Sequence, residues 1–494
     1  MKKVNWKLII IFSVIIIISA ILLFYKLGDQ YMWTDEIFSF NTGKMILEKG
    51  KPLYDSGLYY QRSTVYHYIL ALSMKLFGIN EFGSRVINIF PLVSAGLILF
   101  FFIRDILKKN KYRDIYGIIG YTLFITLNFS VAMARETRMY AITTFLLILT
   151  IYAFYKGFFF SKSKILNRFK NLNVKYNITW IIIFGLSLYL AYETQPISIL
   201  ITIGLVAFFF IKFLSKRRWE FFILTIIFIA VGLFTVWQRY NTLNLYQVFL
   251  SLSPDWATNP PSILYYPVLL ARNLFGMFLI SPLILYTTFK FKKESDYYIF
   301  FIFICYLLFI SLQKAQHERY LEPILPTVII MTVVSIARII LYIKKKTLFI
   351  TIISVILLTP QIYLLQKEIR EIDTYTPESI SIHKKMEFNK VFDYLDRINL
   401  EEYTLMGDYH ASFTLLEKGY DIKYILVTEN RINREQLERE EYFHTPYLVY
   451  ESNEFNKLIN EKKVLVIIRD LYKFPTIQNH FNKVINIEEP AIFY

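Results

Sequence analysis

Long apolar blocks, separated by short charged segments, dominate the first 365 residues of the chain. A membrane-spanning helix needs about 20 mostly apolar residues to cross roughly 30 Å of hydrocarbon. Eleven blocks are predicted to be such helices: residues 8–25, 86–103, 114–131, 138–157, 178–193, 196–213, 219–237, 266–289, 296–312, 323–343 and 347–365. The pattern therefore predicts an α-helical polytopic membrane protein. Because no small-residue cleavage site follows the first block, we expect it to be a retained anchor.

The segment 62–79 is shorter and carries His67 and Lys75. If it does not span the membrane, the basic clusters at 104–113, 156–177, 212–218, 290–293 and 344–346 all fall on the cytoplasmic side, as the positive-inside rule favours. We therefore predict an amphipathic helix in the outer interface, within an outer loop formed by residues 26–85. The N-terminus is then cytoplasmic, and the C-terminal part of this multi-pass cell-membrane protein is extracytoplasmic.

Composition supports a membrane protein. Hydrophobic residues make up 55% of the chain and charged residues 19%, against about 25% charged residues in soluble proteins. These values exclude a disordered protein, a collagen-like fibre and a typical cytosolic enzyme. The single cysteine, Cys305, excludes a disulfide framework and a cysteine-based metal cluster.

Charge divides the chain into two parts. Residues 1–365 carry 38 Lys and Arg against 16 Asp and Glu, whereas residues 366–494 carry 17 against 23. Because the basic residues lie between apolar blocks, they indicate contact with the anionic headgroups of a lipid bilayer and not with nucleic acid. In the tail we expect a helix at 388–398, strands at 423–428 and 463–469, and a charged helix at 429–442. The predicted domains are a membrane domain, 1–365, and a small extracytoplasmic α/β domain, 366–494.

Candidate chemistry begins in the first outer loop, where Asp35 and Glu36 follow Trp33. A carboxyl group at a membrane boundary loses solvation and becomes a better proton acceptor. The alternative is a solvated loop with an interfacial aromatic residue. Arg85, which precedes the second predicted span, could bind phosphate, but a snorkelling arginine at a helix end is the simpler interpretation.

Two further clusters lie on the predicted outer side. Ionisable groups at membrane depth usually face a cavity or a partner, although a salt-bridged turn or pairing with lipid headgroups would also explain them. Arginine binds phosphate oxygens in bidentate fashion, and lysine adds a point charge. The first cluster contains Arg135, Glu136, Arg138 and Tyr140, and the second contains Lys314, His317, Arg319 and Tyr320.

Together these groups predict an extracytoplasmic pocket with carboxylates at Asp35, Glu36 and Glu136 beside a set of cations. Such a pocket suits transfer from a lipid phosphate, in which a base deprotonates an acceptor hydroxyl and the cations stabilise the departing phosphate. A divalent metal ion near Asp35 and Glu36 is possible, but two adjacent carboxylates do not define a coordination shell.

The order of these motifs resembles the GT-C superfamily of membrane glycosyltransferases, in particular bacterial relatives of the protein O-mannosyltransferases and of the lipid A aminoarabinose transferases. The motifs are the Trp-x-Asp-Glu first loop, Glu81-Phe82-x-x-Arg85, Arg135-Glu136-x-Arg138-x-Tyr140 and Arg319-Tyr320-x-x-Pro323-x-x-Pro326. One departure is the stretch 60–64, which lacks the His-Pro-Pro found in many relatives.

The resemblance implies a polyprenyl-phosphate sugar donor and work on the outer membrane face. It implies a catalytic carboxylate at Asp35, a second acidic position at Glu136, and contact of Arg319 and Tyr320 with the lipid phosphate. We therefore predict a glycosyltransferase that moves a sugar from a polyprenyl-phosphate donor to an extracytoplasmic protein, lipid or cell-wall glycan, with Asp35 as the general base. The alternatives are a polysaccharide polymerase or ligase, and a transporter or flippase of lipid-linked saccharides, which would place ionisable residues in mid-span.

Overall fold

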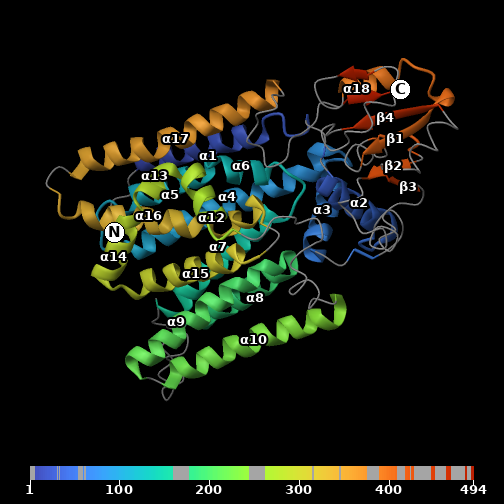
Figure 1. The fold of residues 1–494 in the computed structure, drawn as a ribbon. Helices are drawn as coiled ribbons and strands as arrows, with labels where there is room; N and C mark the ends of the chain where they lie inside the picture. The colour runs from blue at the N-terminus through green and yellow to red at the C-terminus, as the bar shows by residue number, and fades with distance from the viewer. Residues whose placement is uncertain are drawn as a thin grey trace.

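The computed structural model is a bundle of long helices with a small sheet at one end (Figure 1). It describes residues 6–29, 32, 34–53, 59–60, 63–159, 177–217, 219–243, 262–313, 316–343, 346–374, 389–408, 415, 418–422, 424–427, 447–450, 463–468, 484–486 and 491–493. The helices up to Thr374 are α1 (Trp6–Phe24), α2 (Thr34–Lys49), α3 (Thr64–Phe77), α4 (Glu81–Ile106), α5 (Arg113–Ile125), α6 (Asn128–Ala134), α7 (Tyr140–Phe158), α8 (Ile178–Thr194), η2 (Pro196–Ile199), α9 (Leu200–Lys216), α10 (Trp219–Leu243), α12 (Tyr265–Asn273), α13 (Phe275–Leu279), α14 (Ser281–Phe291), α15 (Glu294–Ser311), η3 (Glu318–Tyr320), η4 (Glu322–Ile324), α16 (Leu325–Ile340) and α17 (Lys346–Thr374).

The helices confirm the predicted fold class. In the described part of the chain, seven are long and apolar enough to cross a membrane, or eight if the bent pair α5 and α6 forms one span. The helix α8 and the segment 221–234 of α10 are apolar but shorter. Every predicted span falls on helical structure, while the total of eleven spans remains a prediction.

Two predicted spans differ from single straight helices. The block 114–131 bends by 60° between α5 and α6. The block 266–289 is divided into α12, α13 and α14, and Pro282 lies in the first turn of α14. A proline lacks the backbone donor that helix continuation needs but suits the first turn of a new helix, which explains why a helix begins there.

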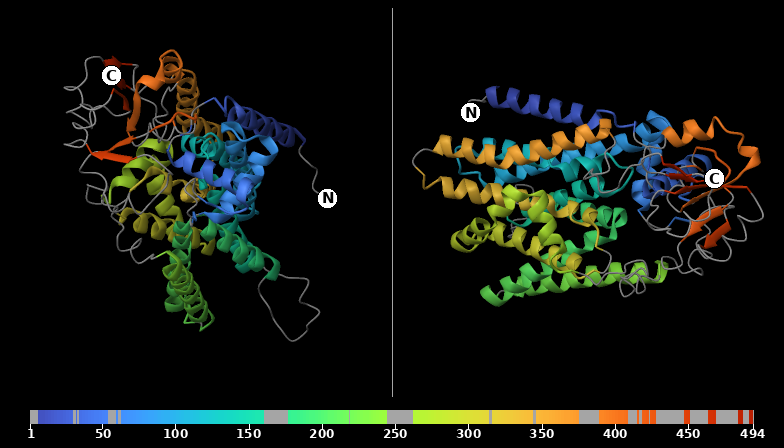
Figure 2. Two further views of the ribbon diagram at one scale, coloured as in Figure 1. Left: turned by 90° about the vertical axis from the view of Figure 1, so that its right-hand side faces the viewer. Right: turned by 45° about the horizontal axis from the view of Figure 1, so that its top comes forward.

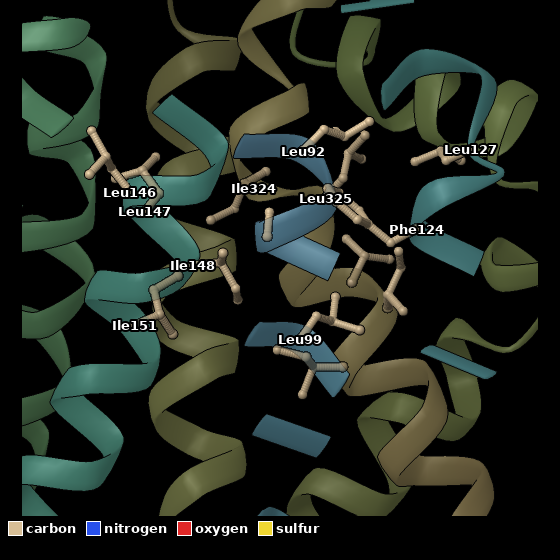
Figure 3. Close-up of a cluster of buried hydrophobic side chains, with 14 of the residues drawn as sticks. Leu92, Leu99, Phe124, Leu127, Leu146, Leu147, Ile148, Ile151, Ile324 and Leu325 are labelled. Carbon is tan, nitrogen blue, oxygen red and sulfur yellow. The ribbon is translucent and has the colours of Figure 1, made fainter. Parts of the chain in front are cut away.

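Aliphatic layers hold the bundle together. Figure 3 shows leucine and isoleucine side chains of α4, α7, η4 and the start of α16, together with Phe124 of α5, gathered in one apolar cluster. Leu99 and Leu147 are completely buried in this core. The helices α9 and α15 approach closely at Gly204. A Cβ atom at this position would lie only 2.6 Å from the Cα of Ile302, which is too close for a side chain. Large apolar side chains remain exposed on α1, α8, α10 and α17, as expected of a surface that faces lipid.

The two ends of the bundle differ. In Figure 1 and in the right-hand view of Figure 2, α1 begins at the end remote from the sheet, and α2 and α3 lie next to the sheet at the other end. The helix α3 is amphipathic: it buries Tyr66 and Leu70 and exposes Leu72 and Leu76. It corresponds to the predicted interfacial helix. Which side of a membrane each end faces remains a prediction.

The C-terminal part contains α18 (Asn389–Leu395), η5 (Leu400–Glu402) and a six-stranded sheet. Its strands are β1 (Thr404–Asp408), β2 (Tyr424–Val427), β3 (Tyr447–Tyr450), β4 (Val464–Ile468), β5 (Val484–Asn486) and β6 (Ala491–Phe493), in the order β3-β2-β1-β4-β6-β5. The first four are parallel, and β6 is antiparallel to both neighbours. The helix α18 and the strands β2 and β4 match predicted elements, whereas the predicted helix 429–442 lies outside the described residues.

The junction between the two parts is helical. The helix α17 continues past residue 365 to Thr374, so the boundary between residues 365 and 366 stays a prediction. Near the sheet, the Lys418 ammonium lies 3.2 Å from the Glu81 carboxylate at the start of α4.

Candidate active site

Asp35 and Arg319 meet at the end of the bundle that carries the sheet. Asp35 lies in the first turn of α2, and its Oδ2 accepts a hydrogen bond of 2.8 Å from Arg319 Nη1. Arg138 Nη2 lies 3.3 Å from the same oxygen. The Asp35 side chain is 28% exposed, so it remains open to an arriving substrate. A carboxylate in the first turn of a helix also interacts favourably with the positive end of the helix dipole.

Arg138 holds the first turn of α2 by several contacts. Its Nη1 donates to the Asp35 carbonyl over 2.9 Å and lies 3.1 Å from Ser39 Oγ. Only 9% of its side chain is exposed. The residue comes from the turn between α6 and α7, where its own N–H donates to the Glu136 carbonyl over 2.7 Å. Arg138 thus links this turn to Asp35 through both the carboxylate and the backbone.

Arg319 lies close to two aromatic rings. Its guanidinium carbon is 6.0 Å from the ring centre of Tyr140 and 5.8 Å from that of Tyr320. Cations are attracted to the faces of aromatic rings at such distances. Tyr140 opens α7, and Tyr320 follows Arg319 in η3. These two rings and Asp35 therefore orient a guanidinium that is only 12% exposed.

Glu36 lies behind Asp35 and is fully buried against Arg85. Arg85 Nε donates to Glu36 Oε1 over 2.9 Å, and its Nη2 donates to Oε2 over 3.2 Å. The backbone N–H of Thr137 also donates to Oε1, over 2.7 Å. Arg85 Nη1 reaches the Leu27 carbonyl at 3.0 Å. This set of contacts joins α2, α4, the loop after α1 and the turn before α7.

A close approach of α3 and α4 sets the position of Arg85. Asn80 caps α4 by accepting the Gly83 N–H at 2.8 Å, and Ser73 of α3 donates to the Gly83 carbonyl over 2.6 Å. A Cβ atom at Gly83 would overlap the carbonyl oxygen of Gly78, which ends α3 with a φ of 102°. Glycine at position 83 is therefore needed for this packing.

Arg135 and Glu136 belong to the support around the site. Arg135 donates to the carbonyls of Leu23, Tyr25 and Lys26, at 3.1, 2.7 and 3.1 Å. These are carbonyls at the end of α1, where intrahelical partners run out. Glu136 is 2% exposed, and Asn88 Nδ2 donates to its carbonyl over 2.5 Å.

His317 borders the Arg319 side of the site. Its pKa falls from 6.5 to about 4, mainly because it is buried and also because Arg319 lies nearby, although Asp35 acts in the opposite direction. The imidazole is therefore neutral at pH 7. The Tyr266 hydroxyl donates to the His317 carbonyl over 3.1 Å. Lys314, the remaining predicted cation, lies outside the described residues.

Sequence reasoning missed three contributors to the site. Ser39 and the backbone N–H of Thr137 are contact partners that no local pattern indicates. Glu322 is completely buried where η4 begins, and a carboxyl immediately before the apolar block 323–343 was a visible signal.

The two adjacent carboxylates do not fit a shared metal site. Asp35 faces Arg138 and Arg319, whereas Glu36 faces Arg85 and the Thr137 N–H. A divalent cation prefers several converging oxygen ligands, and guanidinium groups would repel it. Within the described ranges, no group of three or more His, Cys, Asp and Glu side chains could hold a metal ion.

Comparison with known sequences gives a partial relative. No family model matches the chain. An uncharacterized protein of Aquifex aeolicus (strain VF5) is 28% identical over 153 residues, which are 30% of this chain and 30% of that protein. The match thus spans less than a third of that relative's length.

Solved structures match nearly the whole chain. ArnT from Cupriavidus metallidurans bound to undecaprenyl phosphate aligns with a TM-score of 0.60 over 99% of this chain and 98% of ArnT, at 11% identity. The archaeal oligosaccharyltransferase AglB from Archaeoglobus fulgidus, in complex with an inhibitory peptide and a dolichol-phosphate, aligns with a TM-score of 0.57 over 98% of this chain and 74% of AglB, also at 11% identity. Another AglB structure is a complex with Zn and sulfate. At such identities the likeness concerns the fold, and the chain has the fold of the GT-C superfamily, to which ArnT and AglB belong.

Proposed function

We propose that the protein is a glycosyltransferase that moves a sugar from a polyprenyl-phosphate donor to an acceptor hydroxyl on the outer side of the membrane. The observation that carries the proposal is the pair formed by Asp35 and Arg319, a base and a phosphate-binding cation at one end of a membrane bundle. Support comes from the neighbours, because ArnT was solved with undecaprenyl phosphate and AglB with a dolichol-phosphate.

Asp35 is the proposed base because of its exposure. Of the three predicted acids, Glu36 is fully buried and Glu136 is 2% exposed, whereas 28% of the Asp35 side chain is accessible. A general base must lie within hydrogen-bond reach of the proton that it takes. Glu36 supports the site instead, since both of its oxygens accept hydrogen bonds from Arg85.

In the proposed reaction the acceptor oxygen attacks the anomeric carbon of the sugar, and Asp35 takes the hydroxyl proton. The bond between the anomeric carbon and the phosphate oxygen breaks, and the polyprenyl phosphate leaves with the bonding electron pair. Arg319 stabilises the charge that develops on this phosphate. Because Arg319 contacts Asp35 directly, a bound phosphate competes for the same guanidinium, which leaves the carboxylate more basic when the donor is in place.

The test is a transfer assay with purified protein and a panel of labelled polyprenyl-phosphate sugars, offered with protein, lipid and glycan acceptors. We expect label to move to one acceptor class and polyprenyl phosphate to be released in equal amount. Growth of one glycan chain on its lipid would indicate a polymerase. Movement of intact donor across proteoliposomes without transfer would contradict the proposal and support a flippase. The same assay with EDTA and with added divalent metal ions tests whether transfer depends on a metal ion.

A further inference from the structure

Glu322 is a buried carboxyl whose surroundings differ from those of the buried acids Glu36 and Asp296. Glu36 is paired with Arg85, and Asp296 is paired with Arg338. The hydrogen-bond partner of Glu322 is instead the hydroxyl of Thr144 on α7. Its Oε1 atom is buried and has no hydrogen-bond partner among the described residues. An ionised carboxylate is very costly in such surroundings, whereas a neutral carboxylic acid is much less so.

A protonated Glu322 satisfies both contacts of the Thr144 oxygen. The Thr144 oxygen lies within hydrogen-bond distance of both the Tyr140 carbonyl, at 3.0 Å, and the Glu322 carboxyl. A hydroxyl has one proton, so it donates to only one acceptor at a time. When that proton goes to the Tyr140 carbonyl, a protonated Glu322 supplies the proton for the second bond.

Glu322 belongs to a segment that three buried side chains hold in place. Tyr266 of α12 bonds to the His317 backbone at 3.1 and 3.2 Å. Tyr306 of α15 donates to the Tyr320 carbonyl over 3.0 Å. The third contact is the one between Glu322 and Thr144. Along the chain, Arg319 lies between the first attachment point, His317, and the last, Glu322.

The contact with Thr144 acts on the same part of α7 that touches Arg319. Tyr140, one helical turn before Thr144, presents its ring 6.0 Å from the Arg319 guanidinium. Loss of the Glu322 contact would therefore allow the segment 317–322 to shift relative to Tyr140. Displacements of about 1 Å in a positioned group can reduce an enzymatic rate about a hundredfold.

We propose that Glu322, as a neutral acid bonded to Thr144, is a positioning residue that fixes Arg319 against α7 and at its distance from Asp35. The catalytic consequence rests on the proposed glycosyl transfer. The structural consequence concerns only the segment 317–322 and can be tested without any activity.

Three variants test the proposal: Glu322→Gln, Glu322→Leu and Thr144→Val. Thr143→Val is the matched control, because Thr143 is equally buried on α7 and, like Thr144, bonds to the carbonyl four residues earlier, at Met139, but is not the partner of Glu322. The measurements are hydrogen exchange of the peptide 316–324, binding of undecaprenyl phosphate, the kcat and KM of transfer, and the melting temperature in detergent.

We expect Glu322→Gln, which keeps an N–H donor, to retain wild-type exchange and donor binding within about twofold. Glu322→Leu should accelerate exchange in 316–324 and weaken undecaprenyl phosphate binding at least about tenfold, with Thr144→Val in between. The melting temperature of Glu322→Leu should not fall, because an apolar side chain of similar size suits this buried site. The Thr143→Val control should behave like the wild type.

Two results would overturn the proposal. If Glu322→Leu leaves exchange and lipid binding unchanged, the residue does not position Arg319. If Glu322→Gln is as impaired as Glu322→Leu, the site needs a charged carboxylate. Should the wild type transfer no sugar from any donor, the proposed function fails, while the exchange measurements still decide the role of Glu322.

Discussion

Arg319 donates a hydrogen bond of 2.8 Å to Asp35, although 284 positions separate the two residues in the chain. The contact joins the first turn of α2 to η3, the short helix that leads into α16. It brings a carboxylate and a guanidinium to one point at the end of the bundle. In the proposed reaction the carboxylate accepts the proton of the acceptor and the guanidinium stabilises the leaving phosphate.

The buried pair formed by Glu36 and Arg85 should be a determinant of stability. Removal of one partner leaves an uncompensated charge in the interior, which typically costs about 3–5 kcal/mol. We expect Glu36→Gln and Arg85→Met each to lower the melting temperature in detergent markedly. The double variant should lose less than the sum of the two single losses. Strict additivity in this double-mutant cycle would show that the two side chains do not interact.

Arg138→Lys should impair catalysis more than stability. A lysine ammonium lacks the planar fork that contacts the carboxylate and carbonyl of Asp35 and the Ser39 hydroxyl. We expect kcat to fall about tenfold to a hundredfold as Asp35 loses its orientation. Arg104→Lys is the matched control. Arg104 lies in the last turn of α4, where it forms a partly exposed ion pair with Asp114. Equal kcat values in the two variants would contradict the role of Arg138.

The lowered pKa of His317 leads us to expect that the stability of the folded protein depends on pH. Its pKa is about 4 in the folded protein and 6.5 when unperturbed, so the unfolded chain binds the additional proton first as the pH falls. The neutral His317 therefore contributes to the free energy of unfolding above pH 6.5. This contribution, on the order of 1–3 kcal/mol, is lost as the pH falls toward 4. His317→Gln should melt with a weaker pH dependence over this range. Parallel melting curves for the two proteins would refute the assignment.

The predicted orientation can be tested with cysteine labelling in intact cells. Cys305 is first replaced by serine, and single cysteines are introduced at Lys51 and Lys109, which are both exposed. An impermeant maleimide added from outside should label position 51 and not position 109. Labelling of position 109 alone would invert the topology and place Asp35 on the cytoplasmic side.

The local sequence was sufficient to predict that the apolar blocks of the membrane part are helical, but it did not predict α2, which lies in the expected outer loop. A span is recognised by its length and apolarity, and a chain in lipid has few alternatives to a helix. Short-range pattern predicted less well in the block 266–289, which is divided into three helices, the last of which has Pro282 in its first turn. It also missed the strands β1, β3, β5 and β6, which are short and paired with distant segments.

The site was predicted as a set of residues but not as an arrangement. Asp35 and Arg319 were predicted to meet because both lay on the same predicted side of the membrane. No local pattern distinguished the accessible Asp35 from the buried Glu36, its immediate neighbour. That difference depends on Arg85 and Thr137, 49 and 101 positions away, and so on tertiary packing alone.

The most direct test of the account is the rate of sugar transfer by Asp35→Asn. The amide preserves the size of the side chain but cannot accept a proton as a carboxylate does. General base catalysis is typically worth about 10²- to 10⁴-fold, so we predict a fall in kcat of at least about a hundredfold, with undecaprenyl phosphate still bound. A folded Asp35→Asn protein that transfers sugar at the wild-type rate would contradict the account.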